Sequence, residues 1–292
     1  MKLKQYIKRI KEECWALGFV RGGMEMIMES NHLEVDWVKM PKDRWFADPF
    51  VLDVTAEEIL ILVEDFGYDI HKGVISLLHI NRKTMEIASR KVLLEKPTHL
   101  SFPAIWRYDR HIYIYPENAQ GGQLDMYEYH PDSETLTFVK TLCEDVVWDS
   151  YVTEAFGEPL MFTANSNDFE LDIYKQNETN EHFLPYLQVA SDVPNMRMGG
   201  GVFLYNNSAY YPAQDNRRTY GGALDIKRID YEKGKFTVEI VKHIESPNKR
   251  YPLGLHTLNE YNGIVVIDVK GYRYGKIGEL MARLVTILRK VL

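Results

Sequence analysis

Carboxylate residues recur at the ends of short apolar stretches along this chain of 292 residues. Asp48 stands before a proline, Glu117 ends an aromatic, strand-like run, and Asp149 follows a tryptophan. Two carboxyl groups on either side of a glycosidic bond can break it, one as general acid and the other as base or nucleophile. These residues could therefore cleave or transfer a sugar if the fold brings them together.

Each of these carboxylates also has a structural interpretation. Asp48 could cap a turn, because an aspartate side chain accepts hydrogen bonds from nearby backbone N–H groups. The neighbours Glu64 and Asp65 could belong to a solvated turn, and Glu117 could simply start a loop. The residue types alone leave both interpretations open.

Arg197 and two histidines leave a similar choice. Arg197 could form an ion pair with Asp215 or Asp192, or it could bind a sugar hydroxyl or a phosphate through two parallel hydrogen bonds. His99 and His256 stand in strand-edge contexts, where a hydrogen-bonded structural histidine is the commoner case. No paired-cysteine, His-Glu-x-x-His or calcium-loop spacing occurs, so the sequence predicts no dedicated metal site and no cofactor, and it leaves a cation bound in the cleft open.

The segments between these residues form a repeated pattern. Short alternating or apolar stretches broken by Gly, Asn, Asp and Pro are typical of all-β proteins. Similar segments begin at Phe46, Leu100, Trp148, Gly199 and Leu255, and a spacing of about 50 residues is typical of propeller blades. The sequence therefore predicts an all-β fold, a five-bladed β-propeller with short amphipathic helices at both termini.

A second strand in each repeat ends on a polar side chain, as at Glu64, Glu117, Asn165, Gln214 and Asp268. In a propeller, the start of the innermost strand and the end of the second strand face the same end of the central channel. We therefore expect an acidic axial cleft with aromatic walls. Its predicted lining is Asp48, Glu64, Asp65, Glu117, Asp149, Asn165, Arg197, Gln214, Asp215 and His256.

Both ends of the chain read as basic amphipathic helices. Residues 2–19 place Leu3, Ile7, Ile10, Cys14 and Trp15 on one helical face. We expect residues 1–30 to form an N-terminal amphipathic helix and linker, residues 31–275 the propeller, and residues 276–292 a C-terminal amphipathic helix. Either helix could dock on the protein itself, or attach it as a peripheral protein to an anionic membrane surface or to a protein partner. The apolar stripe of the C-terminal helix would comprise Ile277, Leu280, Met281, Leu284, Leu288 and Val291.

The composition narrows the partners and the compartment. A formal net charge of −7 and a pI near 5.8 argue against a nucleic-acid-binding surface, which needs an excess of Lys and Arg on one face. Cys14 and Cys143 are isolated thiols, which favours a reducing compartment over a disulfide framework. Charges continue through Glu12 and Glu13, and no apolar stretch is long enough for a signal peptide or a bilayer span. We expect a cytoplasmic protein.

Several motifs, in order from about residue 44 to about residue 270, resemble the N-terminal propeller domain of glucosamine inositolphosphorylceramide transferase. A likeness carried by several ordered motifs is more specific than any single one. The motifs are Phe46-Ala-Asp-Pro-Phe, Ile61-Leu-Val-Glu, Gly73-Val-Ile-Ser, His99-Leu-Ser-Phe-Pro, Tyr113-Ile-Tyr-Pro-Glu, Pro212-Ala-Gln-Asp, Tyr220-Gly-Gly-Ala and His256-Thr.

That domain is in turn similar to the five-bladed propellers of arabinanases, levansucrases and invertases, which cut or transfer glycosidic bonds with acidic residues around the axis. The resemblance implies that Asp48, in the Asp-Pro of the first blade, is the base or nucleophile, with Glu117 or Asp149 as proton donor. In the hydrolases an aspartate of the second blade tunes the acid. The matching stretch here, Ser101 to Ala104, has no carboxylate, and this departure weakens the implication of hydrolysis.

Two functions follow from these observations. One is a carbohydrate-active propeller, glycoside hydrolase-like or glycosyl-transferring, that acts on a glycan or sugar conjugate with the acidic residues of the axial cleft. The other is a noncatalytic glycan-binding or scaffold module of a polysaccharide or glycoconjugate biosynthesis system. In the first, Asp48, Glu117 and Asp149 carry out the chemistry and the rest of the lining binds the substrate.

Overall fold

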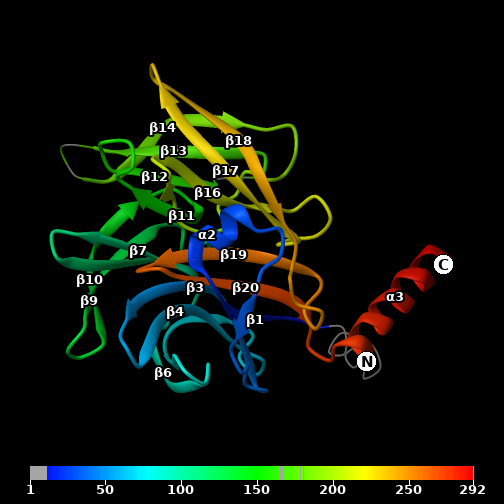
Figure 1. Cartoon of the computed structure of the whole chain (residues 1–292). Coiled ribbons are helices and arrows are strands. Elements are labelled where there is room, and N and C mark those ends of the chain that lie inside the picture. Colours follow the sequence, from blue (N-terminus) through cyan, green and yellow to red (C-terminus); the bar gives the residue numbers. More distant parts are fainter. Residues whose placement is uncertain (1–11, 165–166, 178, 180, 292) are drawn as a thin grey trace.

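The computed structural model describes residues 12–164, 167–177, 179 and 181–291, with side chains described as far as residue 285. Five four-stranded antiparallel sheets are arranged around a common axis (Figure 1). This confirms the five-bladed β-propeller that the repeat predicts.

The first four blades follow the sequence, each from its innermost strand outward. Blade one consists of β3 (Arg44–Val54), β4 (Glu58–Gly67), β5 (Gly73–Asn81) and β6 (Ile87–Leu94). Blade two consists of β7 (Ser101–Tyr108), β8 (His111–Glu117), β9 (Leu124–His130) and β10 (Thr135–Cys143), with the short helix η1 (Ala119–Gly121) after β8. Blade three consists of β11 (Trp148–Thr153), β12 (Leu160–Ala164), β13 (Glu170–Gln176) and β14 (Phe183–Ala190). Blade four consists of β15 (Phe203–Tyr205), β16 (Ser208–Asp215), β17 (Ala223–Glu232) and β18 (Lys235–Ile244).

Blade five joins the two ends of the described chain. Its strands lie in the order β19 (Gly254–Tyr261), β20 (Ile264–Tyr272), β1 (Glu13–Val20) and β2 (Val35–Trp37). β1 pairs with β20 along its whole length, from Glu13 opposite Tyr272 to Val20 opposite Val265. Backbone hydrogen bonds between segments from opposite ends of the sequence therefore close the ring, which leaves the innermost strands fixed around the axis.

The prediction of an N-terminal helix is wrong where the structure describes it. Residues 13–20 form the strand β1, and the short helix α2 (Gly23–Glu29) follows where a linker was expected. Every residue of β1 after Glu13 is buried, and a strand buried on both faces reads as a continuous apolar run that periodicity alone does not separate from a buried helix. In the described part of the chain, the first strand of the propeller therefore begins at Glu13, before the predicted start at residue 31. The predicted helical residues Leu3, Ile7 and Ile10 lie outside the described residues.

The aromatic residues that stand out in the composition mainly fill the core. One apolar cluster joins blades one to four, and its fully buried aromatic residues include Phe102, Phe162, Tyr174 and Phe183. Phe162 packs edge to face against Phe236, with ring centres 5.7 Å apart, a favourable geometry for aromatic pairs. Packing between neighbouring blades is what holds the axial ends of the strands at fixed positions.

The C-terminal helix is confirmed as α3 (Lys276–Val291), and it extends away from the propeller (Figure 1). At its base the Arg250 guanidinium donates hydrogen bonds to the carbonyl oxygens of Tyr272 and Arg273, at 2.7 and 2.8 Å. Among the described residues, no helix has the length and the apolar character needed to cross a membrane.

Candidate axial site

The innermost strands share a distortion where they reach the axis. Asp48, Phe102 and Asp149 have left-handed backbone, with φ of 49°, 42° and 47°. Pairing with the second strand shifts register at each of these points, which is the signature of a β-bulge that re-aims a side chain. Left-handed backbone is strained for residues other than glycine and clusters at functional sites. Three blades therefore present the corresponding side chain at the same end of the axis.

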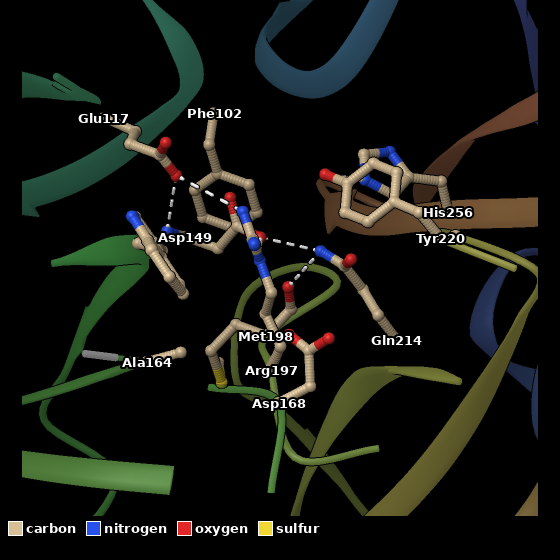
Figure 2. A network of polar contacts seen from close by, with 12 residues as sticks. Phe102, Glu117, Asp149, Ala164, Asp168, Arg197, Met198, Gln214, Tyr220 and His256 are labelled. Atoms are coloured by element: carbon tan, nitrogen blue, oxygen red, sulfur yellow. Dashed lines mark hydrogen bonds and ion pairs between the residues drawn. The ribbon is translucent and has the colours of Figure 1, made fainter. Parts of the chain in front are cut away.

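Asp149 is held there by an ion pair. Its Oδ2 accepts hydrogen bonds from Arg197 Nε at 2.5 Å and from Gln214 Nε2 at 2.7 Å (Figure 2). Burial of the carboxyl group would raise its pKa, but the adjacent Arg197 guanidinium outweighs burial and keeps the pKa of Asp149 below its usual value. Asp149 is therefore ionised at neutral pH.

Glu117 lies beside this ion pair and shows the opposite tendency. Its Oε2 accepts a hydrogen bond from the backbone N–H of Asp149 at 3.0 Å and lies 3.6 Å from Arg197 Nη2 (Figure 2). Burial, followed by the negative charge of Asp149, raises the pKa of Glu117 to about 8. Two adjacent carboxyl groups therefore differ at neutral pH, because Glu117 holds a proton and Asp149 does not.

Asp48 is not paired with a guanidinium group of any described residue. Its Oδ2 accepts a hydrogen bond from the backbone N–H of Phe102 at 3.0 Å, and its buried Oδ1 has no hydrogen bond to any described residue. His256 Nδ1 lies between two carboxylates, 3.3 Å from Asp48 Oδ1 and 3.2 Å from Asp268 Oδ2. Burial, followed by neighbouring carboxylates beginning with Glu64, raises the pKa of Asp48 well above its usual value. Asp48 thus favours its protonated form.

Two aromatic rings flank Arg197. Its guanidinium carbon lies 5.2 Å from the ring centre of Trp148 and 5.5 Å from that of Tyr220. Tyr220 is 45% exposed, and its hydroxyl group is 2.9 Å from His256 Nε2. A partly exposed aromatic ring beside polar groups can stack on a sugar ring while those groups bind its hydroxyls.

A cavity of about 540 Å³ adjoins the Tyr220 loop. It is formed by two loops, residues 218–222 and 245–253, and Arg218 and Lys249 are among its lining residues. Lys270 Nζ holds the first loop by donating a hydrogen bond to the Tyr220 carbonyl oxygen at 3.0 Å. The cavity has the size of a small-molecule binding site, but its lining includes none of the axial residues.

The sequence of this chain is similar to that of a known protein family. The sequence model described as "Glucosamine inositolphosphorylceramide transferase 1, N-terminal" matches residues 38–264. The chain belongs to this family. Two curated relatives, from Oryza sativa subsp. japonica and Arabidopsis thaliana, are named glucosamine inositolphosphorylceramide transferase 1 and are each 24% identical to this chain, over 208 and 149 residues. The matches cover 68% and 48% of this chain but 27% and 20% of the relatives, so the chain spans about a quarter of their length or less.

Two solved structures similar to this member of the transferase N-terminal family are glycoside hydrolases. One is a family 43 β-xylosidase/α-arabinofuranosidase from a compost microbial metagenome in complex with xylotriose, with a TM-score of 0.55, 9% identity and coverage of 72% of this chain and 79% of the other. Another is a family 117 glycoside hydrolase from Zobellia galactanivorans, with a TM-score of 0.53, 12% identity and coverage of 90% of both chains. At this identity the likeness confirms the propeller fold alone.

The structure brings most of the predicted lining of this family member together. The residues that meet at the axis are Asp48, Glu117, Asp149, Arg197, Gln214 and His256. Glu64 lies at the edge of this group, where its Oε1 is 3.1 Å from His99 Nε2. Asn165 lies outside the described residues.

Asp65 and Asp215 do not join the axial group, contrary to the prediction. Asp65 is fully buried in a network with Arg44, Arg90 and Ser76. Asp215 accepts two hydrogen bonds from the Arg217 guanidinium, at 2.7 and 2.6 Å, and so does not pair with Arg197. Successive side chains of a strand point to opposite faces, so the residue that follows Glu64 or Gln214 in its strand is turned away from the cleft.

The sequence prediction left out Asp268, Trp148 and Tyr220. Asp268 lies in the second strand of blade five, β20, and its carboxylate accepts hydrogen bonds from the backbone N–H groups of Asp48 and Thr257. The polar residue at the end of each second strand was a sufficient signal for it. Tyr220 comes from a loop, whose course no strand periodicity reveals.

Within the described part of the chain, two clusters have the donor atoms that a metal ion would need. Asp48, His256 and Asp268 each offer one ligand atom, and these atoms lie within 4.8 Å of one another. A cation there would bind carboxylate oxygens and an imidazole nitrogen, and it would displace the proton of Asp48. The second cluster, Asp215, Asp225 and His243, is next to the Arg217 guanidinium, which already supplies a positive charge.

Proposed function

We propose that this propeller is carbohydrate-active and acts on a glycan or sugar conjugate at the axial cleft, with glycoside hydrolase-like or glycosyl-transferring chemistry. The pair Glu117 and Asp149 carries the proposal, because environments that push the pKa values of two carboxyl groups apart are typical of acid–base sites. The names of the relatives and the xylotriose complex of a structural neighbour support a sugar ligand.

In this proposal Glu117 is the proton donor and Asp149 tunes it. The two carboxyl groups are within hydrogen-bonding reach, whereas carboxyl groups that flank a scissile glycosidic bond stand about 5–5.5 Å or more apart. Asp149 therefore acts on Glu117 by charge and position and does not face it across the substrate.

The bond-breaking step needs a second group, which we assign to Asp48. As the glycosidic C–O bond breaks, Glu117 gives its proton to the leaving oxygen. Ionised Asp48 either attacks the anomeric carbon or takes the proton of the attacking water or hydroxyl group. Because burial raises the pKa of Asp48, Asp48 keeps its proton at low pH and the reaction slows there. Above about pH 8 Glu117 loses its proton, and the reaction slows again.

A leaving-group experiment tests these roles. Aryl and alkyl glycosides of common sugars are screened with the full chain, and Glu117→Gln and Asp48→Asn are compared with Asp230→Asn, a change at an exposed position. Glu117→Gln should lower kcat on an alkyl glycoside by about 10²–10⁴, and much less on a nitrophenyl glycoside, whose leaving group needs no proton. Equal losses on both substrates would contradict the assignment of Glu117, and full activity of Asp48→Asn would contradict that of Asp48.

A noncatalytic glycan-binding or scaffold role is the second candidate. The observation that favours it is burial, because Asp48 and Asp149 are only 2% and 3% exposed and their oxygens mostly contact the protein itself. Titration calorimetry that detects binding of an oligosaccharide, with no cleavage or transfer after long incubation, would select this role.

We further propose that the protein serves glycan biosynthesis in the cytoplasm, with a terminal helix attaching it peripherally to a membrane or to a protein partner. The free, buried thiols of Cys14 and Cys143 are consistent with a reducing compartment, and the names of the relatives support the biosynthetic role. Fractionation of cells that carry a tagged full chain tests the location. Recovery from an extracellular fraction would contradict it.

A further inference from the structure

The helix α3 presents an apolar stripe to the solvent. Ile277, Leu280 and Leu284 are 65%, 59% and 44% exposed. Their spacing of three and four residues places them on one face of the helix. Adjacent exposed side chains of this size are typical of an interaction surface, so we define these three residues as the α3 stripe.

Charge indicates what covers the α3 stripe. Residues 276–292 contain four basic residues and one acidic residue, although the whole chain has a net charge of −7. Lys276 and Arg283 are seven residues apart in the sequence, which keeps them on one side of the helix. An apolar face bordered by basic residues matches an anionic lipid surface, where the apolar side chains enter the acyl boundary and the cations bind lipid phosphates.

The helix α3 and the axial site lie at the same end of the propeller. β20 carries Asp268, which binds the backbone of Asp48, and the same strand runs on to Tyr272, from which the chain enters α3. Second strands end at the axial-site end of the propeller. The helix therefore leaves the body at the end that holds the axial site, and it extends beyond that end (Figure 1).

We propose that the α3 stripe docks in the interfacial region of an anionic lipid bilayer and so turns the axial-site end of the propeller toward the membrane. The helix lies along the surface, with the stripe facing the acyl chains and Lys276 and Arg283 at the level of the phosphates. The apolar stripe and the excess of basic residues beside it together favour a lipid surface over a protein partner.

Vesicle co-sedimentation of the full chain tests the docking. Vesicles of phosphatidylcholine alone are compared with vesicles that also contain phosphatidylglycerol. We expect at least about tenfold more bound protein on the anionic vesicles, a loss of about tenfold in Leu280→Glu/Leu284→Glu, and a smaller, salt-dependent loss in Arg283→Glu. Leu204→Glu is the matched control, because Leu204 is 67% exposed on another part of the propeller; it should bind as the unchanged protein does.

A fluorescent label reports the orientation. Cysteine is introduced at Lys249, beside the cavity at the axial-site end, or at Lys83, in the turn between β5 and β6 at the other end. Lipids with quenching headgroups should quench the label at position 249 and leave that at position 83 bright. Equal quenching would contradict the proposed orientation.

Three outcomes would overturn the docking. They are no binding to either vesicle, equal binding of Leu280→Glu/Leu284→Glu, and a dimer in light scattering that this double variant abolishes, which would make a second copy of the chain the occupant. Circular dichroism of each variant separates loss of docking from loss of folding. The vesicle experiment uses no sugar, so its failure leaves the assignment of Glu117 and Asp48 unaffected, and failure of that assignment leaves the docking standing.

Discussion

The two halves of the axial site differ in protonation although their backbones are alike. Asp48 in blade one and Asp149 in blade three stand at equivalent bulges, with φ of 49° and 47°, and both are almost completely buried. Burial and neighbouring carboxylates raise the pKa of Asp48, whereas the Arg197 ion pair outweighs burial and lowers that of Asp149. The local strand geometry sets where a carboxyl group points. A partner distant in sequence sets its charge.

The largest effect on stability is expected from removal of Arg197, the partner of Asp149. Arg197→Met should lower the free energy of unfolding by about 3–5 kcal/mol, because it leaves the buried carboxylate of Asp149 without a compensating charge. Urea unfolding at pH 7 measures the loss. The control is Arg218→Met, at a guanidinium with an exposed fraction of 84%, which should stay within about 0.5 kcal/mol of the unchanged protein. Similar losses in both variants would remove the distinction between the two halves.

The next effect concerns the pH dependence of stability. Folding raises the pKa of Glu117 from 4.5 to about 8, so the folded state holds the proton more tightly than the unfolded state does. The contribution of this group is therefore fully present below about pH 4.5 and is lost as the pH rises to about 8. Between pH 5.5 and pH 8.5 this should lower the free energy of unfolding by at most about 3 kcal/mol.

Glu117→Gln should remove this part of the slope, because glutamine does not titrate. Urea unfolding of both proteins across the same pH range measures the difference, and Glu57→Gln, at an exposed turn, is the control. Parallel slopes for the unchanged protein and Glu117→Gln would show that the Glu117 proton does not contribute to stability.

The smallest effect is expected at Asp48. Asp48→Asn should change the free energy of unfolding by less than about 1 kcal/mol at pH 7, because a protonated carboxyl group and an amide are both neutral and alike in shape. Asp149→Asn should cost several times more, since it leaves Arg197 without its buried anion. Thermal unfolding of the two variants side by side compares the halves directly, and equal losses would contradict the assigned protonation states.

Much of this architecture could be predicted from the sequence, because the blade is a repeated unit. The five recurring segments, which begin at Phe46, Leu100, Trp148, Gly199 and Leu255, give the number of blades and the positions that meet at the axis. Asp48, Glu117 and Asp149 could be placed in this way, since strand ends in a propeller converge by symmetry. Their protonation states could not, because these depend on contacts such as that of Arg197 with Asp149, across loops of undetermined course.

The errors of the sequence prediction have physical reasons as well. The predicted helix over residues 2–19 is wrong from Glu13 onward, because apolar residues that fit one helical face also fit a buried strand, and only pairing with β20 decides in favour of a strand. The segment 276–291 has one-sided apolar periodicity and is a helix. Asp65 and Asp215 lie outside the cleft because side chains alternate along a strand, so the residues next to Glu64 and Gln214 point to the opposite face.

The protonation state of Glu117 is the most direct test of the proposed site. Infrared spectra of the folded protein at pH 7 should show a carbonyl band of a protonated carboxyl group that disappears in Glu117→Gln, and this band should be lost from the unchanged protein as the pH rises through about 8. A spectrum in which Glu117→Gln removes no such band, or a Glu117 that titrates near its usual value of 4.5, would contradict its role as proton donor.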